Sequence, residues 1–180
     1  MAWSPNHKKQ TREKILHSAA RLFTQRGFDH VGIDDVMTEA GLTRGAFYAH
    51  FKSKSELYAE AIVTAALAAQ STLLAALPER PSRQQVINAY LSNAHRRGDS
   101  ASCPLAFLTT DISQRDPLIR AAYTQVFKGF LNELEPNSQA RENALRSAVL
   151  MIGGMAIARA LDDEDLVGEL FSACQAGASR

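Results

Sequence analysis

The sequence predicts an all-α protein with a small amino-terminal domain and a larger carboxy-terminal domain. Apolar residues recur at the three- and four-residue spacing of amphipathic helices through most of the chain. Glycine and proline interrupt this pattern at intervals, as they do where helices end. With 180 residues, 46% of them hydrophobic and 22% charged, the chain is long enough to bury a core. We place the boundary between residues 55 and 56, so that the domains span residues 1–55 and 56–180.

The first helix is expected from Thr11 to Arg26, with Gly27 as its stop signal. Its apolar residues follow an i, i+4, i+7, i+8 rhythm: Ile15, Ala19, Leu22 and Phe23. Residues 1–10 are polar and lack the apolar stretch of a signal peptide, so we expect a flexible arm there.

The most informative stretch is Ile33 to Lys54, which predicts two short helices and the start of a third. Gly41 stands where the first of these must end, because a left-handed turn is cheap only without a Cβ. Thr43 can cap the next helix, and Phe47 and Phe51 form its apolar stripe. The opposite face is left with hydrogen-bond donors and no acid: Arg44, Gly45, Tyr48 and His50.

Two helices joined at a glycine turn, with basic and aromatic groups on the second, predict a helix-turn-helix that reads the major groove of DNA. The alternative is an ordinary helical hairpin. Gly45 weighs against that alternative, because glycine costs about 1 kcal/mol inside a helix relative to alanine and has no core role on this face. A bare backbone there allows close approach to a phosphate or a base edge.

The run LFTQRGFDHVG followed by IDDVMTEAGLTRGAFYAHFKSKSEL resembles the DNA-binding domain of TetR/AcrR-type transcriptional regulators over residues 11–60. The remaining two thirds match only in length and helical character. The chain departs from the usual pattern at Val31 and Gly32, where Thr or Ser is common, at Met37 in place of alanine, and at Ala49 in place of a larger residue. We therefore expect a missing helix cap, altered packing at Met37 and one fewer DNA contact.

The predicted DNA-binding residues lie in and beside the second helix. Arg44, Gly45 and Tyr48 are expected to contact bases, and Thr43, His50 and Lys54 to contact phosphates. The full predicted set is Ile33, Thr43, Arg44, Gly45, Ala46, Tyr48, His50 and Lys54.

Charge supports a nucleic-acid partner at one end of the chain. Residues 1–55 carry nine Lys and Arg against five Asp and Glu, a balance of +4, whereas the remainder carries eleven against fourteen, a balance of −3. Lys8, Lys9 and Arg12 could also reach DNA phosphates as a basic arm. For the two lysines a solvated tail is an equally good interpretation.

The carboxy-terminal domain is expected to be a series of helices. Ser53 and Glu56 form a capping box for a long helix that ends near Ala76. Pro104 opens a later helix, and Asp116 with Pro117 opens the one after it, with Leu118 and Ile119 directed inward. The helices expected here span residues 54–76, 82–97, 104–115 and 117–135, one capped by Asn137 or Ser138 that runs to Arg159, and a final helix after residue 165.

No membrane span or secretion signal is expected. The nearest candidate for a span, Ala59 to Leu77, contains Glu60 and Gln70 and is dominated by alanine, so it is interpreted as a helix of a water-soluble protein. We expect a cytoplasmic protein whose two cysteines stay reduced.

The last two predicted helices combine small and large apolar residues. Gly153 and Gly154 cost about 2 kcal/mol together in helix propensity, which tight packing should offset. These helices could simply cover the core. We favour a homodimer interface of four helices, because a helix-turn-helix normally works in two copies on a palindromic operator, and the resemblance implies the same.

The resemblance also implies a small-molecule effector bound among the middle helices. The candidate effector-binding residues are Tyr90, Phe107, Thr110, Asp111, Tyr123, Phe127, Met151 and Met155. For each, core packing is the competing interpretation. His95 could also orient a polar ligand.

Cys103 is a possible sensor of oxidants or electrophiles. It precedes Pro104 at a helix start, where the helix dipole would lower the pKa of the thiol. The competing interpretation is an inert buried cysteine.

The sequence carries no HExxH, GxSxG, CxxC or phosphate-binding glycine loop, so no enzyme, metal or cofactor is expected. The prediction is a DNA-binding transcriptional regulator, a ligand-responsive repressor that binds double-stranded DNA as a homodimer. The alternative is an architectural or ligand-independent DNA-binding protein.

Overall fold

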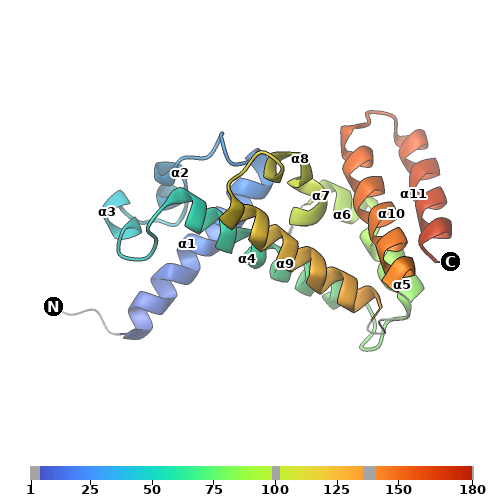
Figure 1. The fold of residues 1–180 in the computed structure, drawn as a ribbon, viewed down its shortest axis with the longest axis horizontal. Coiled ribbons are helices and arrows are strands. Elements are labelled where there is room, and N and C mark those ends of the chain that lie inside the picture. Colours follow the sequence, from blue (N-terminus) through green and yellow to red (C-terminus); the bar gives the residue numbers. More distant parts are fainter. Residues whose placement is uncertain (1–4, 99–101, 136–140, 180) are drawn as a thin grey trace.

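A computed structural model describes residues 5–98, 102–135 and 141–179, and the regular structure in these ranges is helical. Figure 1 shows an elongated molecule, with α2 and α3 at one end and α10 and α11 at the other. Two long helices, α4 and α9, run between the two ends. The all-α fold with an amino-terminal helix-turn-helix and a larger helical domain is confirmed.

The amino-terminal domain contains α1 (Pro5–Arg26), α2 (Ile33–Glu39) and α3 (Arg44–Phe47). Helix α1 begins at Pro5, so part of the expected arm is helical instead. Proline suits a first helical position, and Thr11 bonds to His7 one turn earlier, with 3.2 Å between the hydroxyl oxygen and Nδ1. The side chains of Ile15, Phe23, Val36, Phe47 and Phe51 lie in one hydrophobic core with the first turns of α4.

The two predicted glycine turns are confirmed. Gly27 ends α1 with φ of 76°, and Gly41 follows α2 with φ of 67°, both in the left-handed region. Gly32 caps α2 by position but has no side chain to do so, and Asp35 accepts a hydrogen bond from its backbone nitrogen at 2.6 Å. This bond satisfies one exposed backbone donor at the helix start.

Helix α4 (Lys54–Ala75) belongs to both parts of the molecule. The Ser53 hydroxyl accepts from the Glu56 nitrogen at 3.1 Å, which confirms the cap. The Glu56 carboxylate reaches back to the Lys52 nitrogen at 2.5 Å. Leu57 and Tyr58 are buried in the amino-terminal core, whereas Ala69 belongs to the carboxy-terminal core. The boundary at residues 55 and 56 stays a prediction.

By length and composition alone, α4 could cross a membrane. Core helices pass the same test, and α4 packs against α1 on one side and α9 on another. Its buried side chains lie in the two hydrophobic cores. Packing inside the protein therefore accounts for the buried side of α4.

The single helix predicted over residues 82–97 is wrong. The chain forms α5 (Arg83–Tyr90) and α6 (Asn93–Arg97), because Leu91 leaves helical geometry with ψ of 64°. The Ser92 hydroxyl donates to the Ala89 carbonyl at 2.8 Å and accepts from the His95 nitrogen at 3.3 Å. One serine thus closes the first helix and caps the second.

The helix predicted after Cys103 is also divided, into α7 (Pro104–Phe107) and α8 (Thr109–Ile112). Helix α9 (Pro117–Leu134) begins where predicted, with the Asp116 carboxylate accepting from the Leu118 and Ile119 nitrogens at 3.0 and 3.1 Å. Leu118 was expected to face inward but is 53% exposed. The buried stripe of α9 begins one residue later, at Ile119.

The chain ends with α10 (Arg141–Ala160) and α11 (Glu164–Ala178), which pack against each other. A Cβ added to Gly154 would lie 2.8 Å from the Cys174 sulfur, so this glycine permits the close approach expected of it. A Cβ at Gly153 would meet nothing within 4 Å. The predicted caps Asn137 and Ser138 lie outside the described residues.

Met37→Ala should destabilise the protein by about 2–5 kcal/mol, because Met37 is 1% exposed and its removal leaves a cavity between α2 and the core. Urea denaturation followed by circular dichroism measures this change. Thr38→Ala, at the exposed neighbouring position, is the control and should stay within about 0.5 kcal/mol of the parent. Equal midpoints for both variants would contradict the packing role of Met37.

Candidate nucleic-acid interface and ligand cavity

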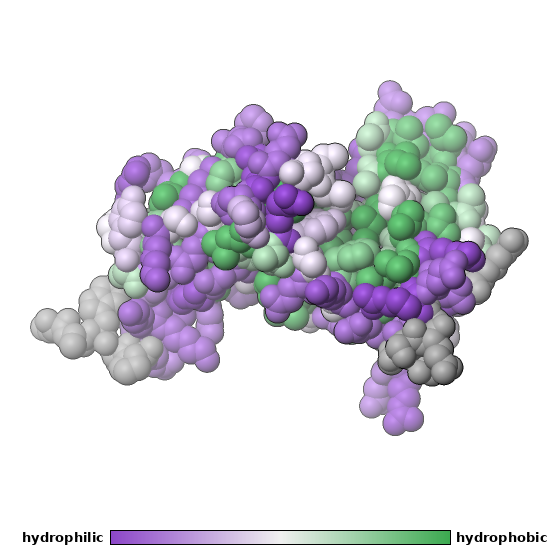
Figure 2. All heavy atoms as spheres, in the orientation of Figure 1, coloured by the Kyte–Doolittle hydropathy of each residue, from purple (hydrophilic) through white to green (hydrophobic). Residues whose placement is uncertain are grey.

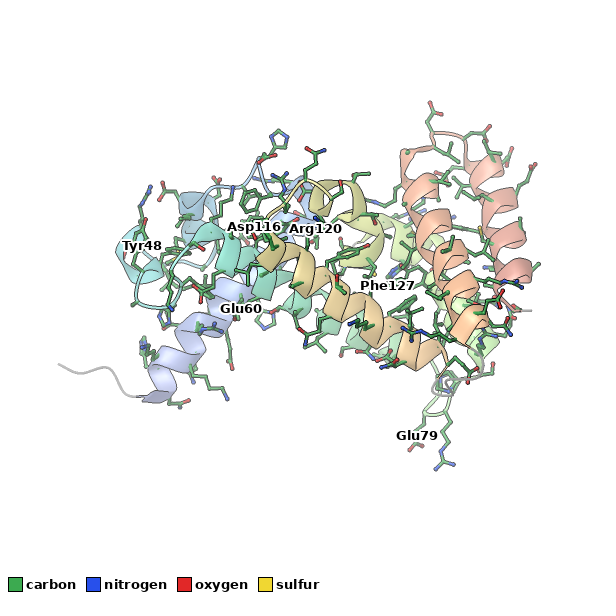
Figure 3. The ribbon with its side chains drawn as sticks, viewed as in Figure 1. Tyr48, Glu60, Glu79, Asp116, Arg120 and Phe127 are labelled. Carbon is green, nitrogen blue, oxygen red and sulfur yellow. The ribbon has the colours of Figure 1, made fainter. Side chains whose placement is uncertain are left out.

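The short helix α3 separates its buried and exposed faces as predicted. Phe47 is fully buried, with its ring 5.8 Å from that of Phe51 and 5.1 Å from that of Tyr48. Tyr48 is 62% exposed, and Figure 3 shows it at the end of the molecule that α3 forms. Thr43 occupies the cap position but makes no capping hydrogen bond with its side chain. The structure brings Thr43, Arg44, Gly45 and Tyr48 together on this exposed surface.

Arg44 has an acidic neighbour that the sequence analysis missed. Its Nη1 lies 2.6 Å from Asp34 Oδ2, and both side chains are exposed. The hydrogen bond with Tyr48 and then the charge of Asp34 raise the pKa of the Arg44 guanidinium. The expectation of a surface without an acid is therefore wrong, because α2 brings Asp34 to it. Water screens an exposed pair of this kind, so a phosphate or base can compete for Arg44.

Gly45 is not required by the fold. It is exposed, and a Cβ built at this position would meet nothing within 4 Å. A glycine that costs helix propensity and fills no packing need fits a surface that must come close to a partner.

Three other predicted DNA-binding residues are placed less favourably. Ile33 and Ala46 are partly buried and pack against the amino-terminal core. Burial, with smaller effects from Lys8 and Arg12, lowers the pKa of the His50 imidazole. His50 Nδ1 is buried without a hydrogen-bond partner among the described residues.

Lys54 is engaged inside the domain. Its ammonium donates a hydrogen bond to the Phe28 carbonyl and lies 4.0 Å from the centre of the Phe28 ring. Burial lowers its pKa. A phosphate contact would have to share this ammonium with Phe28.

The basic residues at the amino terminus are divided between pairing and exposure. Arg12 Nη2 lies 2.6 and 2.5 Å from the two carboxylate oxygens of Glu60, and its guanidinium lies 4.7 Å from the centre of the Phe51 ring. Lys9 lies 3.9 Å from Glu13, and both side chains are exposed. Lys52, which the sequence analysis did not include, is an exposed cation in the turn before α4. Its exposure is the one feature that marks Lys52 as a candidate for a phosphate contact, and the sequence does not reveal exposure.

Asp111 was predicted to bind an effector, but the structure places it in a polar junction, defined here as Asp29, Tyr58, Asp111 and Arg115. The Tyr58 hydroxyl donates to Asp111 Oδ2 at 2.6 Å, and Arg115 Nη2 donates to Asp111 Oδ1 at 2.5 Å. Arg115 also forms two hydrogen bonds to the Asp29 carboxylate, at 3.0 and 2.7 Å. These bonds lower the pKa of Asp29 and raise that of Arg115.

The polar junction connects the amino-terminal domain to α8 and to the segment before α9. Asp29 lies in the loop between α1 and α2, Tyr58 lies on α4, and Asp111 lies on α8. The Phe28 nitrogen also donates to Asp111 Oδ1 at 3.4 Å. The helix-turn-helix is thus bonded directly to the domain behind it.

A cavity of about 250 Å³ lies between α4, α5 and α9, with α6 and the start of α7 completing its wall. Most of the wall is apolar. Its polar members come from four helices and the residue before α7: Gln70, Tyr90, His95, Cys103, Gln125 and Glu133. The wall contains neither lysine nor arginine.

Of the eight candidate effector-binding residues, Tyr90 alone lines this cavity. Met151 and Met155 are fully buried in the carboxy-terminal core, and Thr110 is exposed. The Tyr123 hydroxyl donates to the Leu105 carbonyl at 2.8 Å, and the Phe107 ring lies 3.5 Å from the Arg159 guanidinium. Phe127 is partly buried on α9, toward the α10 side of the molecule (Figure 3). These residues and Asp111 do not line this cavity, and their assignment to an effector stays a prediction.

The prediction of a lowered thiol pKa at Cys103 is wrong. Cys103 is 7% exposed, and burial raises the pKa of its thiol despite hydrogen bonds that act the other way. Helix α7 has four residues, so its dipole is small. The thiol lies in the cavity wall, 3.5 Å from the Tyr90 hydroxyl oxygen. A sensing role stays a prediction without this support.

His95 is a partly buried polar residue of the cavity wall. Its ring lies 4.6 Å from that of Tyr90, and Nε2 is buried with no partner among the described residues. Burial lowers the pKa of the imidazole to about 4, so it is neutral at pH 7. Gln70, Gln125 and Glu133 were missed because their convergence depends on how α4 and α9 cross, which no sequence pattern showed.

His95 should make the protein less stable in mild acid. Its folded-state pKa of about 4 is below the unfolded value of 6.5. Between these two pH values the unfolded chain binds a proton that the folded protein does not bind, so the free energy of unfolding decreases as pH falls. From pH 7 to pH 5 the loss should be about 2 kcal/mol. Urea denaturation at both pH values should show a smaller loss in His95→Gln. An unchanged pH slope in that variant would contradict this assignment.

The glycine-hinged helices with exposed Arg44 and Tyr48, ahead of a larger helical domain, define a helix-turn-helix protein of the DNA-binding class. Residues 15–61 match the profile described as "Bacterial regulatory proteins, tetR family". Through its amino-terminal domain the chain matches this family of transcriptional regulators.

Relatives with known sequences agree with this assignment. The chain is similar to the HTH-type transcriptional regulator AcrR of Shigella flexneri, with 46% identity over 52 residues that cover 29% of this chain and 24% of that protein. This match therefore concerns the amino-terminal domain. An uncharacterized HTH-type transcriptional regulator of Bacillus subtilis, YxaF, is 25% identical over 150 residues and 78% of each chain.

Solved structures show the same fold over almost the full chain. A TetR-family transcriptional regulator from Cytophaga hutchinsonii matches with a TM-score of 0.79 and 18% identity, covering 99% of this chain and 97% of that one. The reduced form of NemR from E. coli matches with a TM-score of 0.72 and 19% identity, covering 94% and 95%. At these identities the similarity concerns the fold.

Proposed function

We propose that the protein is a ligand-responsive repressor that binds a palindromic operator as a homodimer. The observation that carries this proposal is the exposure of Arg44, Gly45 and Tyr48 on one surface of a helix-turn-helix. Arg44 and Tyr48 supply hydrogen-bond donors for base edges, and Gly45 lets the backbone come close. Thr43, His50 and Lys54 are assigned to phosphates, with Lys54 released from Phe28 or sharing its ammonium.

The dimer is proposed to form through α10 and α11. Figure 2 shows apolar side chains gathered over these two helices. On α10 the exposed residues Leu145, Val149 and Ile157 share one stripe with Gly153, and on α11 Leu166 is 45% exposed. A monomer would leave these side chains in water, whereas two copies would bury them in a four-helix interface.

Two recognition helices in such a dimer must enter successive major grooves, about 34 Å apart. The cavity between α4 and α9 lies behind the helix-turn-helix, and α4 extends from one to the other. A ligand that binds more tightly to a dimer with a different spacing of the two recognition helices would weaken DNA binding. The size of the effect is set by the difference in ligand affinity between the two spacings. This is the proposed mechanism of derepression.

The relatives named above are transcriptional regulators, and nothing in the described structure indicates catalysis. We propose a cytoplasmic location, as DNA binding requires. The alternative function is that of an architectural or ligand-independent DNA-binding protein. A strong preference for one palindrome over random duplex DNA at 150 mM salt separates a regulator from that alternative.

Arg44→Ala and Lys54→Ala should differ in their effects on DNA binding. Loss of Arg44 should relax sequence preference by about 1–3 kcal/mol at one base pair. Loss of Lys54 should weaken binding to all DNA sequences similarly. It should also reduce the slope of log affinity against log salt concentration by about one. It should also lower the melting temperature, because the ammonium holds the Phe28 carbonyl.

Fluorescence anisotropy with the selected operator and with point variants of it measures both effects. Lys128→Ala, at an exposed lysine on α9, is the control for loss of one positive charge. If both variants lost affinity without any change in preference, the division of roles between bases and phosphates would be wrong.

Val149→Glu should convert the dimer to a monomer, because Val149 is 66% exposed and a charge there would be buried in the proposed interface. Light scattering after size-exclusion chromatography measures the mass, and operator affinity should fall at least tenfold. Thr124→Glu adds the same charge to the exposed surface of α9 and should leave the dimer intact. A Val149→Glu protein that stays dimeric would contradict the proposed α10–α11 interface.

A further inference from the structure

The cavity wall shows which class of ligand it can take, an inference that rests on the proposed ligand response. Its apolar surface comes mainly from α4, α5 and α9, including Leu73, Val86 and Phe130. Tyr90 contributes an aromatic ring whose centre lies 5.7 Å from that of Phe130. Such a wall suits a flat hydrocarbon body.

The cavity offers no positive charge to a ligand. Lysine and arginine are absent from its wall. Burial holds the pKa of His95 at about 4 and raises that of Tyr90, so both side chains are neutral at pH 7. A carboxylate placed here would lose its hydration without gaining an ionic partner, which is costly.

Glu133 is the one carboxylate in the wall. It accepts a hydrogen bond from the Gln70 side-chain amide, which joins α9 to α4 without neutralising the charge. No lysine or arginine among the described residues forms an ion pair with it. Glu133 is exposed, so the site presents a negative charge at the open edge of an apolar surface.

Gly129 leaves room beside Glu133. Gln125, Gly129 and Glu133 follow one another at four-residue spacing on α9, so they share one side of the helix. A Cβ at Gly129 would meet nothing within 4 Å. Glycine inside a helix costs about 1 kcal/mol relative to alanine, yet here it fills no packing need and widens the cavity instead.

We propose that this cavity binds an apolar organic cation, an amine on a flat hydrocarbon body, with the ammonium at Glu133 and the body between Leu73, Tyr90 and Phe130. The volume of about 250 Å³ is below the ~300–1,000 Å³ of drug-sized sites, so a small two-ring body is the appropriate size. The aromatic rings add attraction for a cation at the edge of the wall.

The test uses three probes that share a naphthalene body and differ in charge: 2-naphthylmethylamine, 2-naphthylmethanol and 2-naphthoate. Isothermal titration calorimetry of the full chain at pH 7, without DNA, should rank the amine severalfold tighter than the alcohol. The carboxylate should bind about tenfold or more weaker than the amine. Glu133→Gln should bring the amine to the affinity of the alcohol.

Gly129→Leu should abolish binding of all three probes, because the new side chain enters the cavity. Thr124→Leu is the control, since Thr124 is exposed on the same helix and lies outside the cavity wall. Circular dichroism confirms that both variants are folded. Naphthoate binding as tightly as the amine, full binding by Gly129→Leu, or no binding of the amine at low millimolar concentration would each overturn the proposal.

Operator binding is measured separately on the same preparations. A protein that binds the amine but ignores all duplex DNA keeps this inference and refutes the proposed function. A protein that binds its operator but not the amine does the reverse.

Discussion

The hydrogen bond between the Tyr58 hydroxyl and the Asp111 carboxylate is the contact on which the arrangement of this molecule depends. Tyr58 is fully buried, and its ring lies 4.6 Å from that of Phe23 and 5.1 Å from that of Phe28. The same side chain thus packs the core of the DNA-binding domain and bonds to the domain behind it. Arg115 completes the link by holding Asp111 and Asp29 together.

This junction offers a structural route for the proposed ligand response. Helices α4 and α9 form two sides of the cavity, and each also leads to the polar junction: α4 carries Tyr58, and α9 begins two residues after Arg115. A displacement of either helix by a ligand would move groups that are bonded to the loop before α2. The coupling requires no contact between ligand and DNA, only two arrangements of helices that are already packed together.

The helix-turn-helix could be predicted because its signals are local. Gly41 needs a left-handed backbone, Phe47 and Phe51 lie one helical turn apart, and Ser53 caps the next helix, so short stretches of sequence decide each feature. The cavity could not be predicted in this way. The aromatic and methionine residues chosen for it were core residues in most cases, whereas Gln70 and Glu133, 63 positions apart, meet only because α4 and α9 pack side by side.

By itself the sequence determined the all-α fold, the family of the amino-terminal domain and the exposed surface with Arg44 and Tyr48, because helical periodicity and turn chemistry act over a few residues. Tertiary structure decided which of the predicted site residues are available to a partner. It paired Arg44 with Asp34 and placed the Lys54 ammonium against Phe28. It also buried the thiol of Cys103 and bonded Asp111 within the polar junction. Burial and ion pairing depend on contacts between residues that are distant in the chain, so they are determined only when the helices pack together.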